Sequence, residues 1–296
     1  MDLINAIFQA ISAAFSDVLP VSGSGHLAFY RHLGGKTETF HPVFFAIIHT
    51  VIICVLIFMF RKPFFSLCSE FTGLMKDISS RDFSFKTETP RRDMLFKILI
   101  STSVLIPFLI PFFKNGEKRT SLIGLLDSMR QGKFLLGVGI AFIVSAVLMI
   151  FSLIIYKTIR KPRKKAGFTE ALIFGLVQAL ALLIPGVSRV GALIGAILIC
   201  GISKKYAFDY VFMLSIPSLL FMNIGEYASL GNASGKISFL IILLGIITAA
   251  VVTVAAVRAV YMIVMRNYLV IFGIYSLAAG FLITAFGMID LFGGKL

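Results

Sequence analysis

Two short polar segments of this chain contain the residue types that phosphate chemistry needs. The first, SDVLPVSGSGHLAFY, spans residues 16–30. In it, Ser22 and Ser24 supply hydroxyls, while Gly23 and Gly25 let the backbone approach a ligand closely. A chain break followed by a helix start also offers free N–H groups and the positive end of a helix dipole, which suit a phosphate. We therefore predict that Ser22, Ser24 and Gly25 line an anion site.

The same segment contains two titratable side chains, Asp17 and His26. A histidine can donate or accept a proton near neutral pH, or attack as a nucleophile. Asp17 is placed either to orient His26 or to share a divalent cation. The structural alternative is that the small residues allow close helix packing and that His26 bonds a backbone carbonyl. Because titratable groups are costly within apolar segments, we favour the functional interpretation for the combination.

The second segment, IPGVSRVGALIG, places Arg189 in the middle of an apolar stretch. A charged side chain at the centre of a membrane helix costs at least ~2.5 kcal/mol, so a ligand is a reasonable explanation for it. The guanidinium fork can bind a phosphate or diphosphate through two parallel hydrogen bonds. Ser188 and the backbone of Gly186 would complete an anion cradle, and Gln178, on the preceding helix, would add an amide. The alternative is an ion pair between Arg189 and Asp17.

Other polar residues in apolar runs give weaker signals. His49 lies early in such a run, where a core hydrogen bond and a role at the site are equal alternatives. Asp209, Glu226 and Glu170 lie near the ends of predicted spans, where interfacial water is enough to solvate them. We therefore do not assign these carboxylates to the site.

The composition sets the environment in which both segments must work. Of the 296 residues, 58% are hydrophobic, and the mean hydropathy is +0.96. These values indicate an all-α polytopic membrane protein rather than a soluble domain. The net charge of +14 is typical of cytoplasmic loops that set membrane orientation, so we exclude a nucleic-acid partner.

Apolar runs divide the chain into spans and interrupted segments. A helix needs about 20 apolar residues to cross a bilayer, which predicts about six full spans. These spans lie near residues 41–60, 93–113, 133–156, 206–228, 237–257 and 268–290. The stretches near 3–33 and 168–202 contain the two polar segments instead. Irregular backbone at membrane depth must be covered by protein or line a water-filled cavity, so we predict two re-entrant helical hairpins.

Basic segments predict how the hairpins are oriented. Residues 61–92 and 157–165 are rich in Lys and Arg and are predicted to be loops, and the positive-inside rule places both in the cytoplasm. The first hairpin then enters from the outer face and the second from the cytoplasmic face. We predict one membrane domain, 1–296, with an inverted repeat whose halves cover about 1–113 and 168–290. Such repeats place their site near the bilayer middle.

On these two motifs the chain resembles the bacitracin-resistance type of undecaprenyl-diphosphate phosphatase. That family has a Glu-rich helix leading into LPVSSSGHL, where this chain reads SDVLPVSGSGHL. Its second motif is PGxSRSG, followed by a Gly-rich helix and a serine-proline span, and here it reads PGVSRVG. The resemblance covers nearly the whole length. It implies an inverted-repeat fold in the bacterial inner (plasma) membrane, a site opening to the outer face, a polyprenyl diphosphate lipid substrate and a divalent cation, Mg²⁺ or Ca²⁺.

The chain departs from the family pattern at four positions. The first-helix carboxylate pair reads Ala13 and Asp17, so one acid is missing and the other is shorter. The middle serine of the SSSGH run, a favoured catalytic residue in the family, is Gly23. The second serine of SRSG is Val190. No hydroxyl can therefore be carried over to position 23.

The resemblance assigns roles to the residues that match. His26, Asp17 and Arg189 are the predicted catalytic residues, and Asp17 is also the predicted metal ligand. The predicted phosphate-binding residues are Ser22, Ser24, Gly25, Gly186, Ser188, Arg189 and Gln178.

Three functions fit these residues. The first is hydrolysis of undecaprenyl or another polyprenyl diphosphate to the monophosphate, which recycles the lipid carrier of cell-wall peptidoglycan synthesis. The second is a transporter that moves a lipid-phosphate head group across the membrane, because opposed hairpins that meet at mid-membrane suit alternating access. The third is a catalytically degenerate paralogue that only binds lipid phosphates. Membrane lipids surround the chain in each case, and the sequence leaves a homo-oligomer open.

Overall fold

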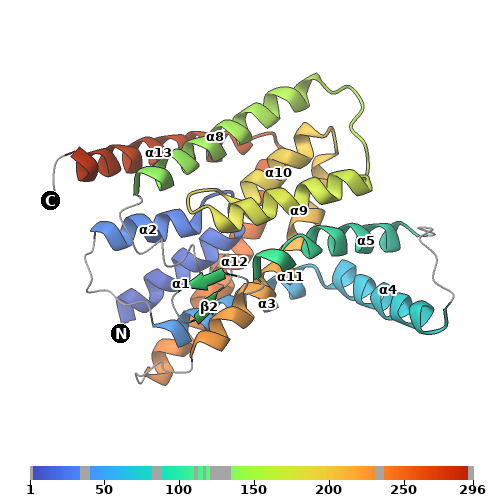
Figure 1. Ribbon diagram of the computed structural model, residues 1–296, viewed down its shortest axis with the longest axis horizontal. Helices are drawn as coiled ribbons and strands as arrows, with labels where there is room; N and C mark the ends of the chain where they lie inside the picture. The colour runs from blue at the N-terminus through green and yellow to red at the C-terminus, as the bar shows by residue number, and fades with distance from the viewer. Residues whose placement is uncertain are drawn as a thin grey trace.

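The computed structural model is almost wholly helical in the part of the chain that it describes (Figure 1). The described residues are 3–33, 41–81, 89–109, 113–115, 118–120, 135–230 and 237–292. The exception to the helices is a small antiparallel ladder, in which β1 (Phe113–Asn115) pairs with β2 (Lys118–Thr120).

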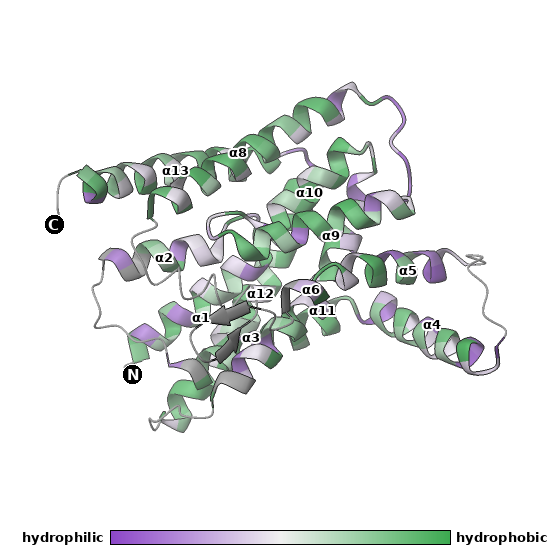
Figure 2. Cartoon of the chain, in the orientation of Figure 1, coloured by the Kyte–Doolittle hydropathy of each residue, from purple (hydrophilic) through white to green (hydrophobic). Residues whose placement is uncertain are grey.

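Four of the described helices are long and apolar enough to cross a membrane. They are α8 (Leu135–Thr158), α11 (Lys204–Ser229), α12 (Phe239–Met265) and α13 (Leu269–Phe292). A fifth span is added if α3 (Pro42–Met59) and α4 (Arg61–Ser79), which meet at an angle of 91°, form one broken span. Figure 2 shows that α8, α12 and α13 are coloured mainly as hydrophobic. The predicted class, an all-α polytopic membrane protein, is confirmed.

The predicted span at 93–113 is shorter than expected, which explains the lower number of spans. Helix α5 (Pro90–Ser103) has 14 residues and is followed by a turn and by the four-residue helix α6 (Ile106–Leu109). Pro107 has no N–H to donate to the carbonyl of Ser103, so the helix cannot continue there without loss. Hydropathy detected an apolar run, but proline divides that run into two helices.

The basic segment 61–92, which we expected to be a loop, contains helix α4. Its apolar residues recur every three or four positions, which is the pattern of an amphipathic helix. Leu74 on this helix is buried against Leu95 and Phe96 of α5. The segment is therefore basic, as expected, but it is ordered by packing against α5.

Both interrupted segments form the predicted pairs of short helices. The first pair is α1 (Leu3–Val18) and α2 (Gly23–Leu33), and the second is α9 (Phe168–Leu183) and α10 (Arg189–Ile199). Each of these helices is shorter than the roughly 20 residues that a bilayer crossing requires. Helix α10 is buried from Arg189 to Leu198, so its arginine lies inside the protein rather than against lipid.

The contacts between helices repeat in the two halves of the chain. Helix α1 packs against α12 as α9 packs against α5, and α3 contacts α12 as α11 contacts α5. Two further pairs, α3 with α11 and α8 with α13, join the halves to each other. An exchange of α1, α3, α5 and α8 for α9, α11, α12 and α13 preserves all of these pairings. These pairings agree with the predicted inverted repeat, whereas others, such as α8 with α10, have no counterpart among the helix pairs in substantial contact. The repeat, its boundaries and its orientation in the membrane stay predictions.

Candidate active site

The two hairpin breaks are in direct contact, as the sequence predicts. The hydroxyl oxygen of Ser22 accepts a hydrogen bond from the backbone N–H of Gly25 at 3.2 Å and another from that of Gly186 at 3.1 Å. The first bond caps the start of α2, and the second joins α2 to the break before α10. Ser24 lies 3.4 Å from Ser22, oxygen to oxygen. A single buried hydroxyl therefore ties the two breaks together.

Close approach of the breaks depends on glycine. A Cβ atom added at Gly25 would lie 2.2 Å from the ring of Phe142 and 2.9 Å from the Cα of Gly186. Gly186 has a φ of +102°, and a Cβ there would lie 2.4 Å from the carbonyl oxygen of Val138. Both glycines were predicted to hold phosphate. Their amides are instead bonded to Ser22, so in this conformation they are not available to an anion.

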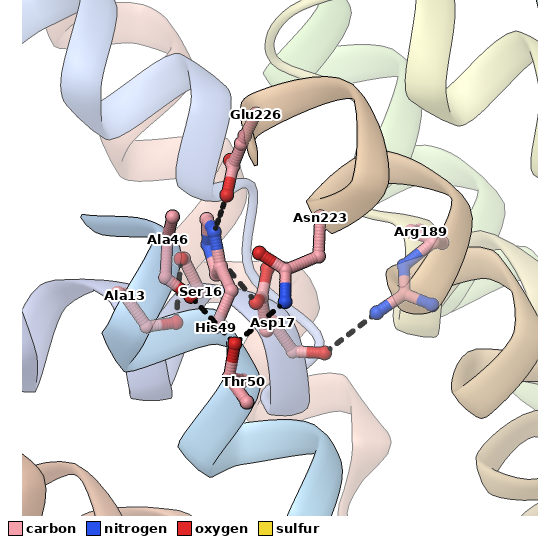
Figure 3. Close-up of polar contacts among 9 residues, drawn as sticks. All are labelled: Ala13, Ser16, Asp17, Ala46, His49, Thr50, Arg189, Asn223 and Glu226. Atoms are coloured by element: carbon pink, nitrogen blue, oxygen red, sulfur yellow. Dashed lines mark hydrogen bonds and ion pairs between the residues drawn. The ribbon is translucent and has the colours of Figure 1, made fainter. Parts of the chain in front are cut away.

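Arg189 reaches from the second hairpin to the first. Its Nη2 donates to the backbone carbonyl of Asp17 at 2.9 Å, as Figure 3 shows. Only 9% of the residue is exposed, and its Nη1 is buried with no hydrogen-bond partner among the described residues. Leaving a buried charged donor unpaired is costly, and a bound anion would remove that cost. The alternative prediction was an ion pair between Arg189 and Asp17. The two residues do bond, but Arg189 donates to the backbone carbonyl of Asp17 and not to its carboxylate.

The carboxylate of Asp17 faces a histidine that the sequence left undecided. His49 Nε2 lies 3.4 Å from Asp17 Oδ2, and His49 Nδ1 lies 2.7 Å from Glu226 Oε2 (Figure 3). The imidazole in the middle is the most buried of the three side chains, with 9% of it exposed, against 17% for Asp17 and 28% for Glu226. Sequence reasoning missed Glu226 because solvation by interfacial water near a span end accounts for a carboxylate at this position. No local pattern could have found it, since its partner lies 177 residues away.

His26 is held by groups other than Asp17. Its Nδ1 lies 2.5 Å from the carbonyl oxygen of Ser22, and its Nε2 lies 2.6 Å from the hydroxyl of Tyr275. A carbonyl can only accept, so Nδ1 carries the proton and Nε2 presents its lone pair to the tyrosine. The ring also stacks on Tyr275 and meets the edge of Phe142. Among the described contacts there is no hydrogen bond between His26 and Asp17, so the orienting role falls to Ser22 and Tyr275.

Ser188 and Gln178 are both buried, but they differ in how well they are paired. The Ser188 hydroxyl accepts from the Gly191 amide at 3.1 Å and caps α10, while its own N–H donates to Ser145 at 2.8 Å. Gln178 is completely buried, and neither atom of its amide has a hydrogen-bond partner among the described residues. Ser188 therefore serves the helix start, whereas Gln178 retains the capacity to bind a ligand.

The backbone leaves no room for a side chain at position 23. A Cβ added to Gly23 would lie 2.0 Å from the Cβ and 2.4 Å from the Oγ of Ser16. The hydroxyl of Ser16 thus occupies the space, and it donates to the carbonyl of Ala13 at 2.9 Å. Ala13 itself is buried and brings no polar group. The motif serine that this chain lacks at position 23 therefore has no free space, because Ser16 fills it.

The described residues include no group of three or more His, Cys, Asp or Glu side chains that could hold a metal ion. Asp17 could provide one ligand, and the oxygens of a bound diphosphate could provide others, which is how Mg²⁺ is commonly held at phosphate sites. The divalent cation stays a prediction that depends on the substrate, and no step of the reaction is derived from it.

Comparisons with known proteins agree with the two motifs. The family described as bacitracin resistance protein BacA matches residues 6–282. Relatives named undecaprenyl-diphosphatase occur in Christiangramia forsetii (29% identical over 283 residues, 95% of this chain and 96% of the relative) and in Treponema denticola (28% over 285 residues, 95% and 96%). Another, from Alkaliphilus metalliredigens, is 25% identical over 293 residues, 98% of this chain and 100% of the relative. Because the family match spans nearly the whole described architecture, the chain belongs to the bacitracin resistance protein BacA family.

Proposed function

We propose that this chain is a membrane hydrolase that converts undecaprenyl diphosphate, or a related polyprenyl diphosphate, to the monophosphate and inorganic phosphate. Family membership and the named activity of the relatives support the reaction. The structural observation that carries it is the buried guanidinium of Arg189, placed where the two hairpins touch, with one nitrogen unpaired. Such a group is matched to an anion and has no evident use in a purely apolar core.

The roles of the residues follow from their contacts. Arg189 would bind phosphate oxygens through its fork and stabilise the negative charge that develops in the transition state. His26 would act through Nε2, because Nδ1 is fixed on the carbonyl of Ser22. With its lone pair, Nε2 would attack the terminal phosphorus and expel the polyprenyl monophosphate, and water would then release inorganic phosphate from the histidine. Alternatively, the doubly protonated imidazolium would protonate the leaving oxygen while water attacks the phosphorus. In either case the Tyr275 hydroxyl that now bonds Nε2 would have to move away.

A divalent cation would be held by Asp17 together with the oxygens of the diphosphate. Such an ion would neutralise charge on the phosphate oxygens during transfer. Phosphate release should then stop when a chelator such as EDTA is added, and it should return with Mg²⁺ or Ca²⁺. Undiminished phosphate release in the presence of EDTA would show that no divalent cation is needed. Arg189 would then be the main positive charge at the phosphates.

The site is proposed to open to the outer face of the bacterial inner membrane. The basic residues of α4 and of segment 157–165 favour a cytoplasmic position for both, and the first hairpin then enters from outside. Glu226 and Tyr227, near the end of α11, lie on this outer side in the same orientation. Such a site would receive the polyprenyl diphosphate at the outer face of the membrane. Its monophosphate product would return to peptidoglycan synthesis as the lipid carrier.

The experiment is phosphate release by the purified chain from farnesyl or undecaprenyl diphosphate. We expect Arg189→Ala and His26→Ala to abolish release, while Arg258→Ala, which removes an exposed arginine on α12, should leave it unchanged. A wild-type turnover equal to that of Arg189→Ala would contradict the proposal. Movement of the head group across liposomes without release of phosphate would support a transporter instead.

A further inference from the structure

A second carboxylate reaches the proposed site through a histidine. Asp17 on α1, His49 on α3 and Glu226 on α11 form a row, with 3.4 Å between Asp17 Oδ2 and His49 Nε2 and 2.7 Å between His49 Nδ1 and Glu226 Oε2. We call these three residues the carboxylate–imidazole array. Figure 3 shows the imidazole between the two acids, with Arg189 on the far side of the Asp17 backbone.

The orientation of the His49 ring is fixed from two sides. Glu226 holds Nδ1 through a short hydrogen bond, and the ring of Phe45 meets the imidazole edge to face, with centroids 4.4 Å apart. With Nδ1 committed to Glu226, the other nitrogen is left to face Asp17. A partner on one ring nitrogen commonly determines what the other nitrogen can bind.

Three buried polar atoms at or beside the array form no hydrogen bond with the described residues. Asp17 Oδ2 faces His49 Nε2 at 3.4 Å but has no hydrogen-bond partner among the described residues, and neither has Oδ1 of Asn223, which is 6% exposed. The unpaired Nη1 of Arg189 belongs to a residue whose other terminal nitrogen bonds the Asp17 carbonyl. Buried polar groups are hydrogen-bonded in most native structures, so these atoms retain the capacity to bind a polar ligand beside Arg189.

We propose that His49 and Glu226 are positioning residues of the hydrolase site, which hold the Asp17 carboxylate beside the phosphate that Arg189 binds. This inference rests on the proposed function and adds to it a contribution from α11, in the second half of the chain. Asp17 has a short side chain, and Ala13, one turn earlier, adds no polar group. The imidazole of His49, itself fixed by Glu226, faces the Asp17 carboxylate and can hold it in one position. Glu226 acts on the reaction only through His49.

Hydrogen bonds next to the array provide a matched control. The Asn223 amide donates to the Thr50 hydroxyl at 2.8 Å, and Thr50 lies 3.1 Å from the hydroxyl of Tyr227. These bonds join α3 to α11 at the same level as His49 and Glu226, but they do not contact Asp17. Tyr227→Phe removes one of them beside Glu226 and tests whether loosening the α3–α11 contact is enough to reduce activity.

The experiment measures kcat and KM for phosphate release from undecaprenyl diphosphate. His49→Phe keeps the aromatic shape, and Glu226→Leu removes the acceptor at similar volume. We expect each to lower kcat by about 10- to 100-fold, the usual range for losing a supporting hydrogen-bond partner, with KM changed by less than about threefold. Glu226→Gln retains an oxygen that can accept from Nδ1 and should recover most of the loss. Tyr227→Phe should match the wild type.

A double-mutant cycle decides whether the effect passes through Asp17. In an Asp17→Asn background, His49→Phe and Glu226→Leu should each cost less than about threefold, because the group they position is already altered. Equal losses in both backgrounds, or wild-type activity of both single variants, would overturn the inference while the proposed function stood. A wild type that releases no phosphate would overturn the proposed function and the inference together. Thermal unfolding of Glu226→Gln checks that the fold is retained.

Discussion

The hairpins α1–α2 and α9–α10 start their second helices in the same way and then differ by one side chain. Ser22 and Ser188 each cap a helix by accepting the amide of the glycine three residues later. The residue after the cap is Gly23 in the first hairpin and Arg189 in the second. The first hairpin has no space for a side chain there, whereas the second uses the position to send a guanidinium back to Asp17. The first hairpin thus contains Asp17 and His26, and the second contains Arg189, so the predicted catalytic residues come from both hairpins.

A second contrast separates a structural ion pair from the carboxylate–imidazole array. Asp93 and Lys97 are buried one turn apart on α5 and bond each other directly. Neither has an unpaired buried side-chain atom among the described residues. The array spans three helices instead, and Asp17 Oδ2 faces His49 Nε2 at 3.4 Å without forming a hydrogen bond. The two clusters thus differ in what they connect: the pair on α5 is local to one helix, whereas the array joins three helices beside Arg189.

The largest effect should come from the glycine that lets the hairpins meet. Gly186→Ala would place a Cβ 2.4 Å from the carbonyl oxygen of Val138 at a φ of +102°, which an L side chain rarely adopts. We expect the break to move away from Ser22 and phosphate release to be lost, with a loss of at least about 2 kcal/mol in stability. Gly73→Ala, whose Cβ meets open space, is the matched control. Normal activity of Gly186→Ala would show that contact between the breaks is unnecessary.

The next effect tests why the first hairpin has no side chain at position 23. Gly23→Ser should disturb the start of α2, because its Cβ would lie 2.0 Å from the Cβ of Ser16, and overpacking of this kind costs about 1–3 kcal/mol. Adding Ser16→Gly should recover stability and activity, measured by thermal unfolding and phosphate release. If the double variant is no better than Gly23→Ser, steric exclusion is the wrong explanation.

A smaller difference should separate the two capping serines. Ser22→Ala removes the acceptor for two amides, one of them in the other hairpin, whereas Ser188→Ala removes the acceptor for one. Loss of an N-cap costs about 1 kcal/mol, and each further buried amide left unpaired adds about 1–3 kcal/mol. Thermal unfolding should therefore rank Ser22→Ala as the less stable variant, with the larger loss of activity. A lower stability of Ser188→Ala than of Ser22→Ala would contradict the larger role assigned to Ser22.

The smallest effect is expected at the tyrosine that bonds His26. Tyr275→Phe keeps the stacked ring but frees Nε2 of the histidine. If the hydroxyl must leave before His26 can act, kcat should change by no more than about tenfold, the scale of one neutral hydrogen bond, while His26→Ala abolishes turnover. Complete loss of activity in Tyr275→Phe would instead place the tyrosine among the reacting groups.

Much of this architecture could be predicted from the sequence because it depends on local signals. Proline, glycine and serine marked both breaks, and apolar length marked α8, α11, α12 and α13. The full span predicted near 93–113 is not formed, because Pro107 stops a helix that hydropathy alone would extend beyond α5. The convergence of Asp17 with Arg189 was predicted from the symmetry of the two breaks, and the bond between them bears it out.

The carboxylate–imidazole array could not be predicted from the sequence because its three residues meet only through the tertiary packing of α1, α3 and α11. His49 and Glu226 look like a core histidine and an interfacial acid when each is considered alone. Only the packing of α3 against α11 brings them together, and only the position of α1 adds Asp17. Local periodicity contains no record of which helices meet. The use of Ser22 as the acceptor for Gly25 and Gly186 was hidden for the same reason.

The central claim is that Arg189 binds the diphosphate at the contact between the hairpins through its guanidinium fork. The most direct test is phosphate release from undecaprenyl diphosphate by the wild type and by Arg189→Lys, which retains the charge but loses the fork. This account predicts that kcat/KM of Arg189→Lys falls at least about 100-fold, equivalent to about 2.7 kcal/mol of transition-state stabilisation, in a protein that remains folded. Activity of Arg189→Lys within a few fold of the wild type would contradict it.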